Sequence, residues 1–206
     1  MPRPTTPLLT RPGIRTSALS IIDRAGLDGL SMRKLAADLG VSAPALYNHY
    51  PTKEHLLDDV ASEIMERVDV SAFAHGWREG LLTWARSYRA ALAEHPNIVP
   101  FLARGPSRRD ASLRRADTVH GGLVAAGWPP RDATMIGAST KYLVLGAAMG
   151  SFSRGFVDDV QVYVDRYPAL NDAHRLREHA DAVDRDSFDF ALTMFVDGLA
   201  ARLAQR

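Results

Sequence analysis

Apolar residues recur at helical spacing along most of the chain, and no convincing strand pattern interrupts them. These stripes predict helices over about 12–25, 31–39, 43–49, 53–68, 77–94, 111–126, 131–152 and 187–203. The segment 153–187 is irregular and acid-leaning, with helical pieces expected near 157–167 and 172–183. Glycine or proline stands at most of the predicted ends, as is typical of helix boundaries. The sequence therefore predicts an all-α fold.

The stretch 31–53 contains two short helices around a tight turn. An apolar stripe from Met32 to Leu39 gives the first helix a single buried face. Gly40 can adopt the left-handed backbone conformation that ends a helix. The hydroxyl of Ser42 is expected to cap the second helix. This arrangement is typical of a helix-turn-helix.

The second helix, 43–49, is too short to be stable alone, and Leu46 is its expected anchor. In a helix-turn-helix the second helix enters the major groove of DNA. Small residues at its start allow the backbone to approach the DNA, and polar residues follow. The candidate DNA contacts are Ser31, Arg33, Ser42, Ala43, Ala45, Tyr47, Asn48, His49 and Lys53.

Different roles are expected within this set. Asn48 is the best candidate to read a base edge, because asparagine pairs with adenine through two hydrogen bonds. Tyr47, His49 and Lys53 are placed to contact phosphates, which fix the register on the duplex. Two alternatives remain open: Tyr47 as a packing residue, and Ser42 as a helix cap only.

Charge separates the two ends of the chain. Residues 1–53 contain seven Lys or Arg and three acidic residues, so they carry a net charge of +4, whereas the remainder carries −3. A basic end on a mildly acidic remainder is typical of a nucleic-acid-binding domain. The charge pattern is weak evidence by itself, but it coincides with the helix-turn-helix.

Composition excludes several other classes. The chain contains no cysteine, which rules out disulfides and thiolate zinc sites. No apolar run approaches the ~20 residues of a membrane span, and the first ten residues lack the apolar core of a signal peptide. Neither a metal-site histidine spacing nor a nucleophile elbow, Walker loop or dinucleotide glycine motif is present. We therefore expect a cytoplasmic protein that is not an enzyme and has no cofactor or metal.

Two domains are expected: a DNA-binding domain at 11–56, and a ligand-binding and dimerisation domain at 57–206. No flexible linker follows Pro51, so the helix that begins at Lys53 should couple the domains rigidly. Helices 131–152 and 187–203 carry more apolar surface than one small bundle can bury, which indicates a subunit interface. Leu192 and Phe195 are expected at that interface.

A ligand pocket is expected in the second domain, because ligand pockets are mostly apolar with a few polar groups. Its candidate residues are Trp77, Trp84, Tyr88, Phe101, His120 and Lys141. The aromatic residues at 77, 84 and 88 form one stripe and fit the core equally well. His120 fits a satisfied core histidine better than a ligand contact. Lys141, a cation within an apolar helix, can face an anionic ligand, an acid across a dimer, or solvent.

The pattern Gly40-Val41-Ser42-x-Pro44-x-Leu46-Tyr47-x-His49-Tyr50-x-x-Lys53 resembles the DNA-binding signature of the tetracycline-repressor family of bacterial transcriptional regulators. The resemblance continues at Ser87-Tyr88-Arg89-x-Ala91-Leu92-x-x-His95 and at Phe195-Val196-x-Gly198-Leu199. It implies a homodimer, formed by a four-helix bundle across a two-fold axis.

The resemblance also implies a ligand-responsive regulator of double-stranded operator DNA, most simply a repressor released by an apolar or amphipathic molecule. The alternative is a DNA-binding regulator whose body binds a protein partner or no ligand. The tetracycline repressor chelates a magnesium–drug complex with a His and a Glu. Here those positions fall within apolar Val99–Leu102 and near Gly150, whereas a hard cation requires oxygen ligands. Magnesium-tetracycline is therefore not the expected ligand.

Overall fold

The computed structural model describes residues 9–104, 110–164 and 166–205, and within these ranges it contains helices and turns but no strand. The predicted all-α class is confirmed. The α-helices are α1 (Arg11–Gly29), α2 (Met32–Asp38), α3 (Ala43–Tyr47), α4 (Lys53–Met65), α5 (Trp77–Ala93), α6 (Val99–Leu102), α7 (Asp110–Ala125), α8 (Pro130–Met149) and α9 (Ala180–Ala204). The 3-10 turns are η1 (Ser71–His75), η2 (Pro96–Ile98), η3 (Ser153–Gly155), η4 (Val160–Val162), η5 (Pro168–Leu170) and η6 (Ala173–Arg175).

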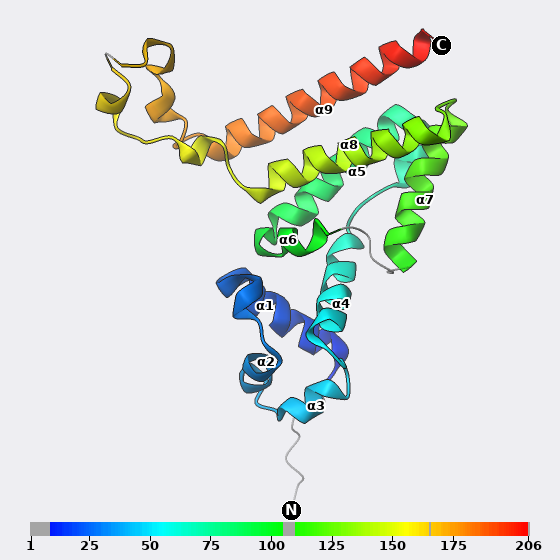
Figure 1. Ribbon diagram of the computed structural model, residues 1–206, viewed down its shortest axis with the longest axis vertical. Helices are drawn as coiled ribbons and strands as arrows, with labels where there is room; N and C mark the ends of the chain where they lie inside the picture. Colours follow the sequence, from blue (N-terminus) through cyan, green and yellow to red (C-terminus); the bar gives the residue numbers. More distant parts are fainter. Residues whose placement is uncertain (1–8, 105–109, 165, 206) are drawn as a thin grey trace, which may run out of the picture.

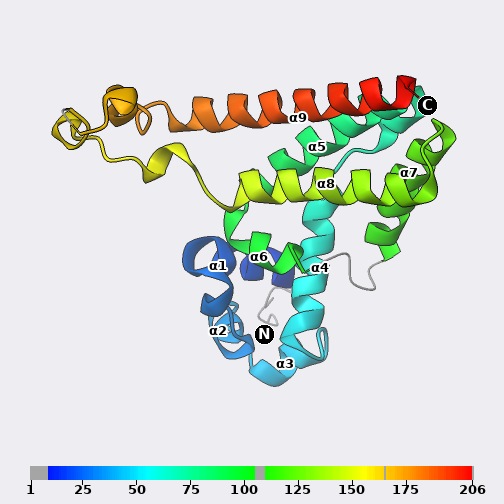
Figure 2. The ribbon, with the colours of Figure 1, turned by 45° about the horizontal axis from the view of Figure 1, so that its top comes forward.

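The helices form two units joined by α4. We call α1 to α3 the head and α5 to α9 the body (Figure 1). In both views α4 rises from the head into the body, and α9, which packs beside α8, is the helix farthest from the head (Figure 2). No helix of the described residues is long and apolar enough to cross a membrane.

Side-chain caps explain where the helices of the head begin. Thr10, Ser31 and Thr52 each accept a hydrogen bond from a backbone N–H in the first turn of the helix that follows. Ser42 makes no such bond, so the predicted role of its hydroxyl as a cap is wrong. Proline in the first turn of α3 partly replaces the cap, because it fixes a helical φ and lacks one of the N–H groups that a cap would satisfy.

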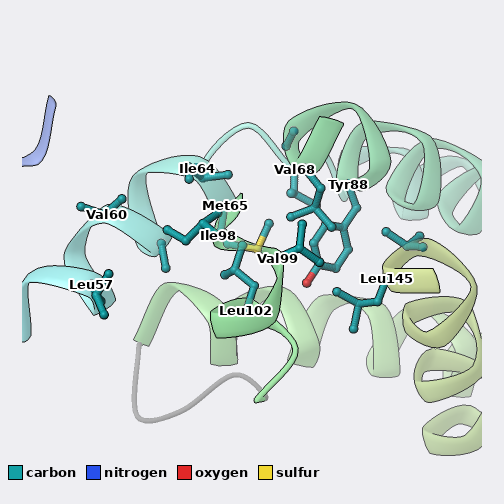
Figure 3. Close-up of a cluster of buried hydrophobic side chains, with 14 of the residues drawn as sticks. Leu57, Val60, Ile64, Met65, Val68, Tyr88, Ile98, Val99, Leu102 and Leu145 are labelled. Carbon is teal, nitrogen blue, oxygen red and sulfur yellow. The ribbon is translucent and has the colours of Figure 1, made fainter. Parts of the chain in front are cut away.

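One hydrophobic core passes from the head into the body through α4. The cluster in Figure 3 includes Leu57, Val60 and Ile64 of this helix, Ile98 beside α6, and Leu145 of α8. All five side chains are buried, and Ile98 is completely so. The head and the body therefore share apolar contacts along α4.

A phenylalanine is wedged between α5 and α7. The ring of Phe73, in η1, lies where a side chain would stand on Gly80 of α5 and on Gly122 of α7. A Cβ atom added at either glycine would lie 2.5 Å from a ring atom. Both helices line the cavity described below, so this contact fixes the distance between two of its walls.

The segment between α8 and α9 differs from the sequence prediction. The helical piece expected near 157–167 is the 3-10 turn η4 instead. The piece expected near 172–183 starts with the 3-10 turn η6, and its end belongs to α9, which begins at Ala180 rather than near 187. The Tyr163 hydroxyl donates to the carbonyl of Val157 at 3.0 Å and accepts from its N–H at 2.8 Å, which closes a turn. The β-branched valines of this segment also disfavour a helix.

The structure corrects one of the two expected subunit contacts, Leu192, and leaves Phe195 as a prediction. Leu192 of α9 is completely buried within the protomer, and Phe195 is half-buried. The large apolar side chains that α8 and α9 expose are others. They are Met135, Tyr142, Met149, Phe190 and Met194.

The Phe73 contact gives a stability prediction. Gly122→Ala should lower the free energy of unfolding by about 1–3 kcal/mol, because the new methyl group overpacks the ring. Gly121→Ala is the matched control. A Cβ there meets nothing within 4 Å, so replacing a helical glycine should stabilise the protein by up to ~1 kcal/mol. Urea unfolding followed by circular dichroism, at one protein concentration, measures both. Equal effects of the two changes would contradict the wedge.

Candidate nucleic-acid interface and ligand cavity

The short helix α3 is anchored by one side chain and exposes the next two. Leu46 is completely buried, whereas Tyr47 exposes 48% of its surface and Asn48 is also exposed. Ala43 and Ala45 are half-buried and small. The outer surface of α3 therefore carries small side chains at its start and polar side chains at its end. This form allows a helix to enter a DNA groove.

Ser31, Arg33 and Ser42 are all exposed near the two helix starts of the motif. The Ser31 hydroxyl accepts the N–H of Lys34 at 3.2 Å and keeps its own proton for an outside acceptor such as a phosphate oxygen. A hydroxyl that caps a helix can therefore still donate to DNA.

Lys53 does not extend into solvent. Its Nζ donates to the carbonyl of Leu27 at 3.0 Å and is part-buried, so it links the first turn of α4 to the end of α1. The ammonium group has three donors, and this bond uses one of them. The structure thus gives Lys53 a structural contact that spacing in the sequence did not indicate.

A residue that the sequence analysis missed fixes the end of the recognition segment. The guanidinium of Arg11 donates to the carbonyl of His49 at 3.0 Å and lies 5.1 Å from the ring centre of Tyr50. His49 itself is half-buried. The last carbonyls of a helix lack intrahelical partners, so a cation there is favourable. Arg11 lies 38 positions before His49, and no local pattern in the sequence could reveal the contact.

A buried phenol connects α3 to α4. The hydroxyl of Tyr50 donates to the Asp59 carboxylate at 2.5 Å, and Arg15 donates to the same carboxylate oxygen at 3.1 Å. Arg15 also donates to Glu63. Burial, followed by the bond to Asp59, raises the pKa of Tyr50 to about 12. The phenol therefore stays protonated and remains a donor at neutral pH.

The head also docks directly on the body. The amide of Asn97 in η2 donates to the carbonyls of Ile22 at 3.1 Å and Asp23 at 2.9 Å, both in α1. The ring of His95 lies 2.9 Å from the Asp23 carboxylate. We call these contacts the latch. Since η2 leads directly into α6, the latch ties α1 to a segment that reaches the interior of the body.

The body contains a cavity of about 300 Å³. Its lining comes from the end of α4 and the residues after it, and from α5, α6, α7 and α8. The lining residues are Met65, Val68, Trp84, Tyr88, Leu102, Ser112, Arg115, Ala116, Val119, His120, Ala133, Thr134, Gly137 and Lys141. A volume of this size is within the range of small-molecule sites.

The structure brings four of the predicted ligand residues together along this cavity: Trp84, Tyr88, His120 and Lys141. The other two lie elsewhere. Trp77 packs edge-on against Trp128, with ring centres 5.9 Å apart, and the Phe101 ring lies 5.9 Å from the guanidinium carbon of Arg104.

Several lining residues were not singled out from the sequence. They include Met65, Val68, Leu102 and Arg115. Within the described part of the chain, no three His, Asp or Glu side chains are placed to hold a metal ion. The lining residues that the structure describes offer apolar surface, hydroxyls, an imidazole and the cationic side chains of Arg115 and Lys141.

The exposed helix α3 can enter a DNA groove and lies on a basic head. Helix α4 joins this head to a helical body that contains a cavity. These features define a helix-turn-helix DNA-binding protein. Family models specify it further. Residues 14–60 match "Bacterial regulatory proteins, tetR family", and residues 73–203 match "Tetracyclin repressor-like, C-terminal domain". The chain belongs to the tetR family of bacterial transcriptional regulators, which confirms the resemblance seen in the sequence.

Individual relatives agree with this assignment. An "HTH-type transcriptional regulator" of Saccharopolyspora erythraea is 32% identical over 69% of the chain, and the match spans 61% of that relative's length. The tetracycline repressor protein class A of Escherichia coli is 31% identical over 90% of the chain and 88% of its own. The crystal structure of the TetR family protein ActR of Streptomyces coelicolor in complex with (S)-DNPA has a TM-score of 0.73. It is 25% identical and covers 94% of the chain and 98% of its own.

Proposed function

We propose that this regulator is a repressor, which binds a palindromic operator as a dimer and leaves it when a small molecule enters the cavity. One observation carries the proposal: Met65, Val68 and Leu102 all line the cavity. They belong to, or follow directly, the two segments that hold the head, namely α4 and the latch with α6. A ligand in the cavity thus touches both connections to the DNA-binding unit.

The mechanism is a change in the spacing of two heads. A two-fold dimer that reads successive major grooves must hold its recognition helices about 34–36 Å apart. Helix α4 has 13 residues and is about 20 Å long, at 1.5 Å per residue. Movement of its cavity end therefore moves its DNA end. A ~100-fold loss of DNA affinity requires a coupling of about 2.7 kcal/mol between the two sites.

The similar proteins support both parts of this proposal. A relative named as a tetracycline repressor supports repression, and the ActR complex supports a small-molecule site within this fold. The alternative is a body that binds a protein partner or nothing. The cavity favours the small molecule, because its volume of about 300 Å³ is within the range of small-molecule sites. On this proposal the protein acts by binding alone, without catalysis, in the cytoplasm where its operator lies.

The proposed contacts with DNA divide by type. Asn48, exposed at the end of α3, reads a base, whereas Tyr47 and His49 contact phosphates. Lys53 contacts a phosphate with the donors that its bond to Leu27 leaves over. Ser31, Arg33, Ser42, Ala43 and Ala45 complete the interface in our proposal.

These roles predict different responses to mutation. Asn48→Ala should weaken binding of the cognate operator by ~1–3 kcal/mol and relax specificity at one base pair. Lys53→Met should weaken cognate and random DNA about equally and lower the slope of log affinity against log salt by about one. Fluorescence anisotropy with a selected operator and a scrambled duplex measures both. Arg131→Met, an exposed cation on the body, is the control and should change neither. Equal losses on both duplexes for Asn48→Ala would contradict base reading.

The dimer is proposed to form through α8 and α9. Tyr142 exposes 71% of its surface on α8, and Phe190 exposes 69% on α9. Exposed apolar side chains of this size on neighbouring helices are typical of a subunit interface.

Tyr142→Glu and Phe190→Glu should therefore each produce a monomer that keeps its helical content, because neither side chain is packed within the protomer. Leu192→Glu should instead destabilise the protomer itself, because Leu192 is completely buried and an unpaired charge there is costly. Analytical ultracentrifugation at micromolar concentration, together with circular dichroism, distinguishes the two outcomes. A wild-type monomer under these conditions would overturn the dimer.

Coupling between the cavity and DNA is reciprocal, which provides the central test. N-phenyl-1-naphthylamine, a neutral apolar fluorophore, is titrated into the protein with and without operator. Operator should weaken probe binding, and the probe should weaken operator binding by the same factor. Gly137→Phe fills the cavity and should abolish the effect, since Cβ at Gly137 meets only Val119, at 3.9 Å. Identical probe affinities with and without DNA would contradict the proposed function.

A further inference from the structure

The angle of α3 depends on contacts beyond its last turn. This helix has five residues, buries the side chain of Leu46, and has no side-chain cap at its start. So short a helix has little stability of its own, and one buried side chain fixes its position but not its angle. Shortly after it come His49, which is half-buried, and Tyr50, which is buried. The contacts that hold these two residues therefore determine how α3 is presented to DNA.

Arg11, the first residue of α1, holds both of them. Its guanidinium donates to the carbonyl of His49 at 3.0 Å and lies 5.1 Å from the ring centre of Tyr50. A planar guanidinium can donate a hydrogen bond and stack on an aromatic ring, which an ammonium group does less well. Arg11 has a fixed base, because the Thr10 hydroxyl caps the first turn of α1 and Ile14 is completely buried.

Tyr50 is held from a second side as well. Its hydroxyl donates to the Asp59 carboxylate of α4 at 2.5 Å, and Arg15 of α1 donates to the same oxygen at 3.1 Å. The ring that Arg11 contacts therefore cannot shift easily. As a result, α1 holds the segment after α3 at two points, directly through Arg11 and indirectly through Arg15.

Asn48 directly precedes these residues, so the backbone that Arg11 holds also carries the side chain proposed to read a base. Resting on that proposed role, we infer that Arg11 is a positioning residue for operator recognition, which acts through His49 and Tyr50 instead of through a phosphate. A base contact requires placement to within about 0.5 Å. Phosphate contacts carry no sequence information directly. Loss of Arg11 therefore lowers specificity more than it lowers affinity for DNA in general.

A phosphate contact is the simpler role for an exposed arginine on a basic head, and it has a different signature. Loss of one phosphate contact weakens all sequences about equally and lowers the slope of log affinity against log salt by about one. A guanidinium that acts on the protein's own backbone leaves this slope unchanged. The salt dependence of binding therefore separates the two roles of Arg11.

The test uses fluorescence anisotropy with a selected operator and a scrambled duplex at several salt concentrations. Arg11→Met should weaken operator binding about tenfold and change binding of the scrambled duplex less than about twofold, with an unchanged salt slope. Arg11→Lys keeps the charge but not the planar group and should give a similar loss. Arg24→Met removes another exposed cation of α1 and is the control, which should leave the ratio of the two affinities unchanged.

A double-mutant cycle tests whether Arg11 acts through the recognition residue. Once Asn48 is replaced by Ala, removing Arg11 should weaken operator binding less than about threefold further, because the contact that Arg11 positions is already lost. Two independent contacts would instead give losses that add. Circular dichroism checks that each variant keeps its helical content, and Arg11→Lys replaces Arg11→Met in the cycle if the latter does not.

The inference is overturned by three results: equal losses on both duplexes with a lower salt slope for Arg11→Met, full operator affinity in Arg11→Lys, or additive losses in the cycle. Failure of the proposed function looks different. If Asn48→Ala weakens both duplexes equally, base reading by Asn48 is wrong. A lower ratio of operator to scrambled affinity in Arg11→Met would then still support the positioning role.

Discussion

The structure depends above all on the burial of α4 from two sides. Leu57, Val60, Ile64 and Met65 are all buried in one core that includes residues of both the head and the body. A 13-residue helix is only marginally stable alone, so packing on both units is what keeps it helical. The same packing makes it a mechanical connection. A helix buried at both ends cannot shift at one end without disturbing the other.

The latch, together with the hydrogen bonds of Tyr50 and Arg15 to Asp59, determines how a shift of α4 moves the head. Tyr50, Asp59 and Arg15 fix the recognition segment to the first half of α4, so the head moves with that helix as one unit. Asn97 meanwhile holds α1 to the segment before α6. The cavity lies beside the far ends of both connections. An occupant can thus strain two supports of the head at once, which is a more direct route than a path through distant side chains.

Sequence reasoning succeeded where the information was local. The stripe from Met32 to Leu39 and the glycine after it were sufficient for the helix-turn-helix, because periodicity and a positive φ at Gly40 are properties of neighbouring residues. It failed at Ser42, where proline in the next helix made a side-chain cap unnecessary. It also placed the start of α9 too late, because the acidic residues at 181–186 conceal a helix stabilised by tertiary packing.

The contacts that define the site were harder to predict from the sequence. The bond from Asn97 to α1 spans about 75 positions, and nothing in either segment indicates the other. No sequence pattern marks a cavity. A stripe such as Trp77, Trp84 and Tyr88 fits a packed core as well as the wall of a cavity. The structure separates them: the first packs on Trp128, while the other two line empty space. The predicted division at residues 56 and 57 also cuts through α4, a helix that both units need.

The break at Gly26, where φ is +71°, has a consequence for how the chain folds. The last carbonyls before a helix break lack a full set of intrahelical partners, and here two of them, at Ile22 and Asp23, accept bonds from the Asn97 amide. The terminal cap of a head helix is thus supplied by the body. Folding of the DNA-binding unit and its docking are therefore cooperative, and a fragment ending after α4 would lose both this cap and the apolar cover of its last helix. In this regulator the DNA-binding head is therefore structurally complete only when it is docked on the body that controls it.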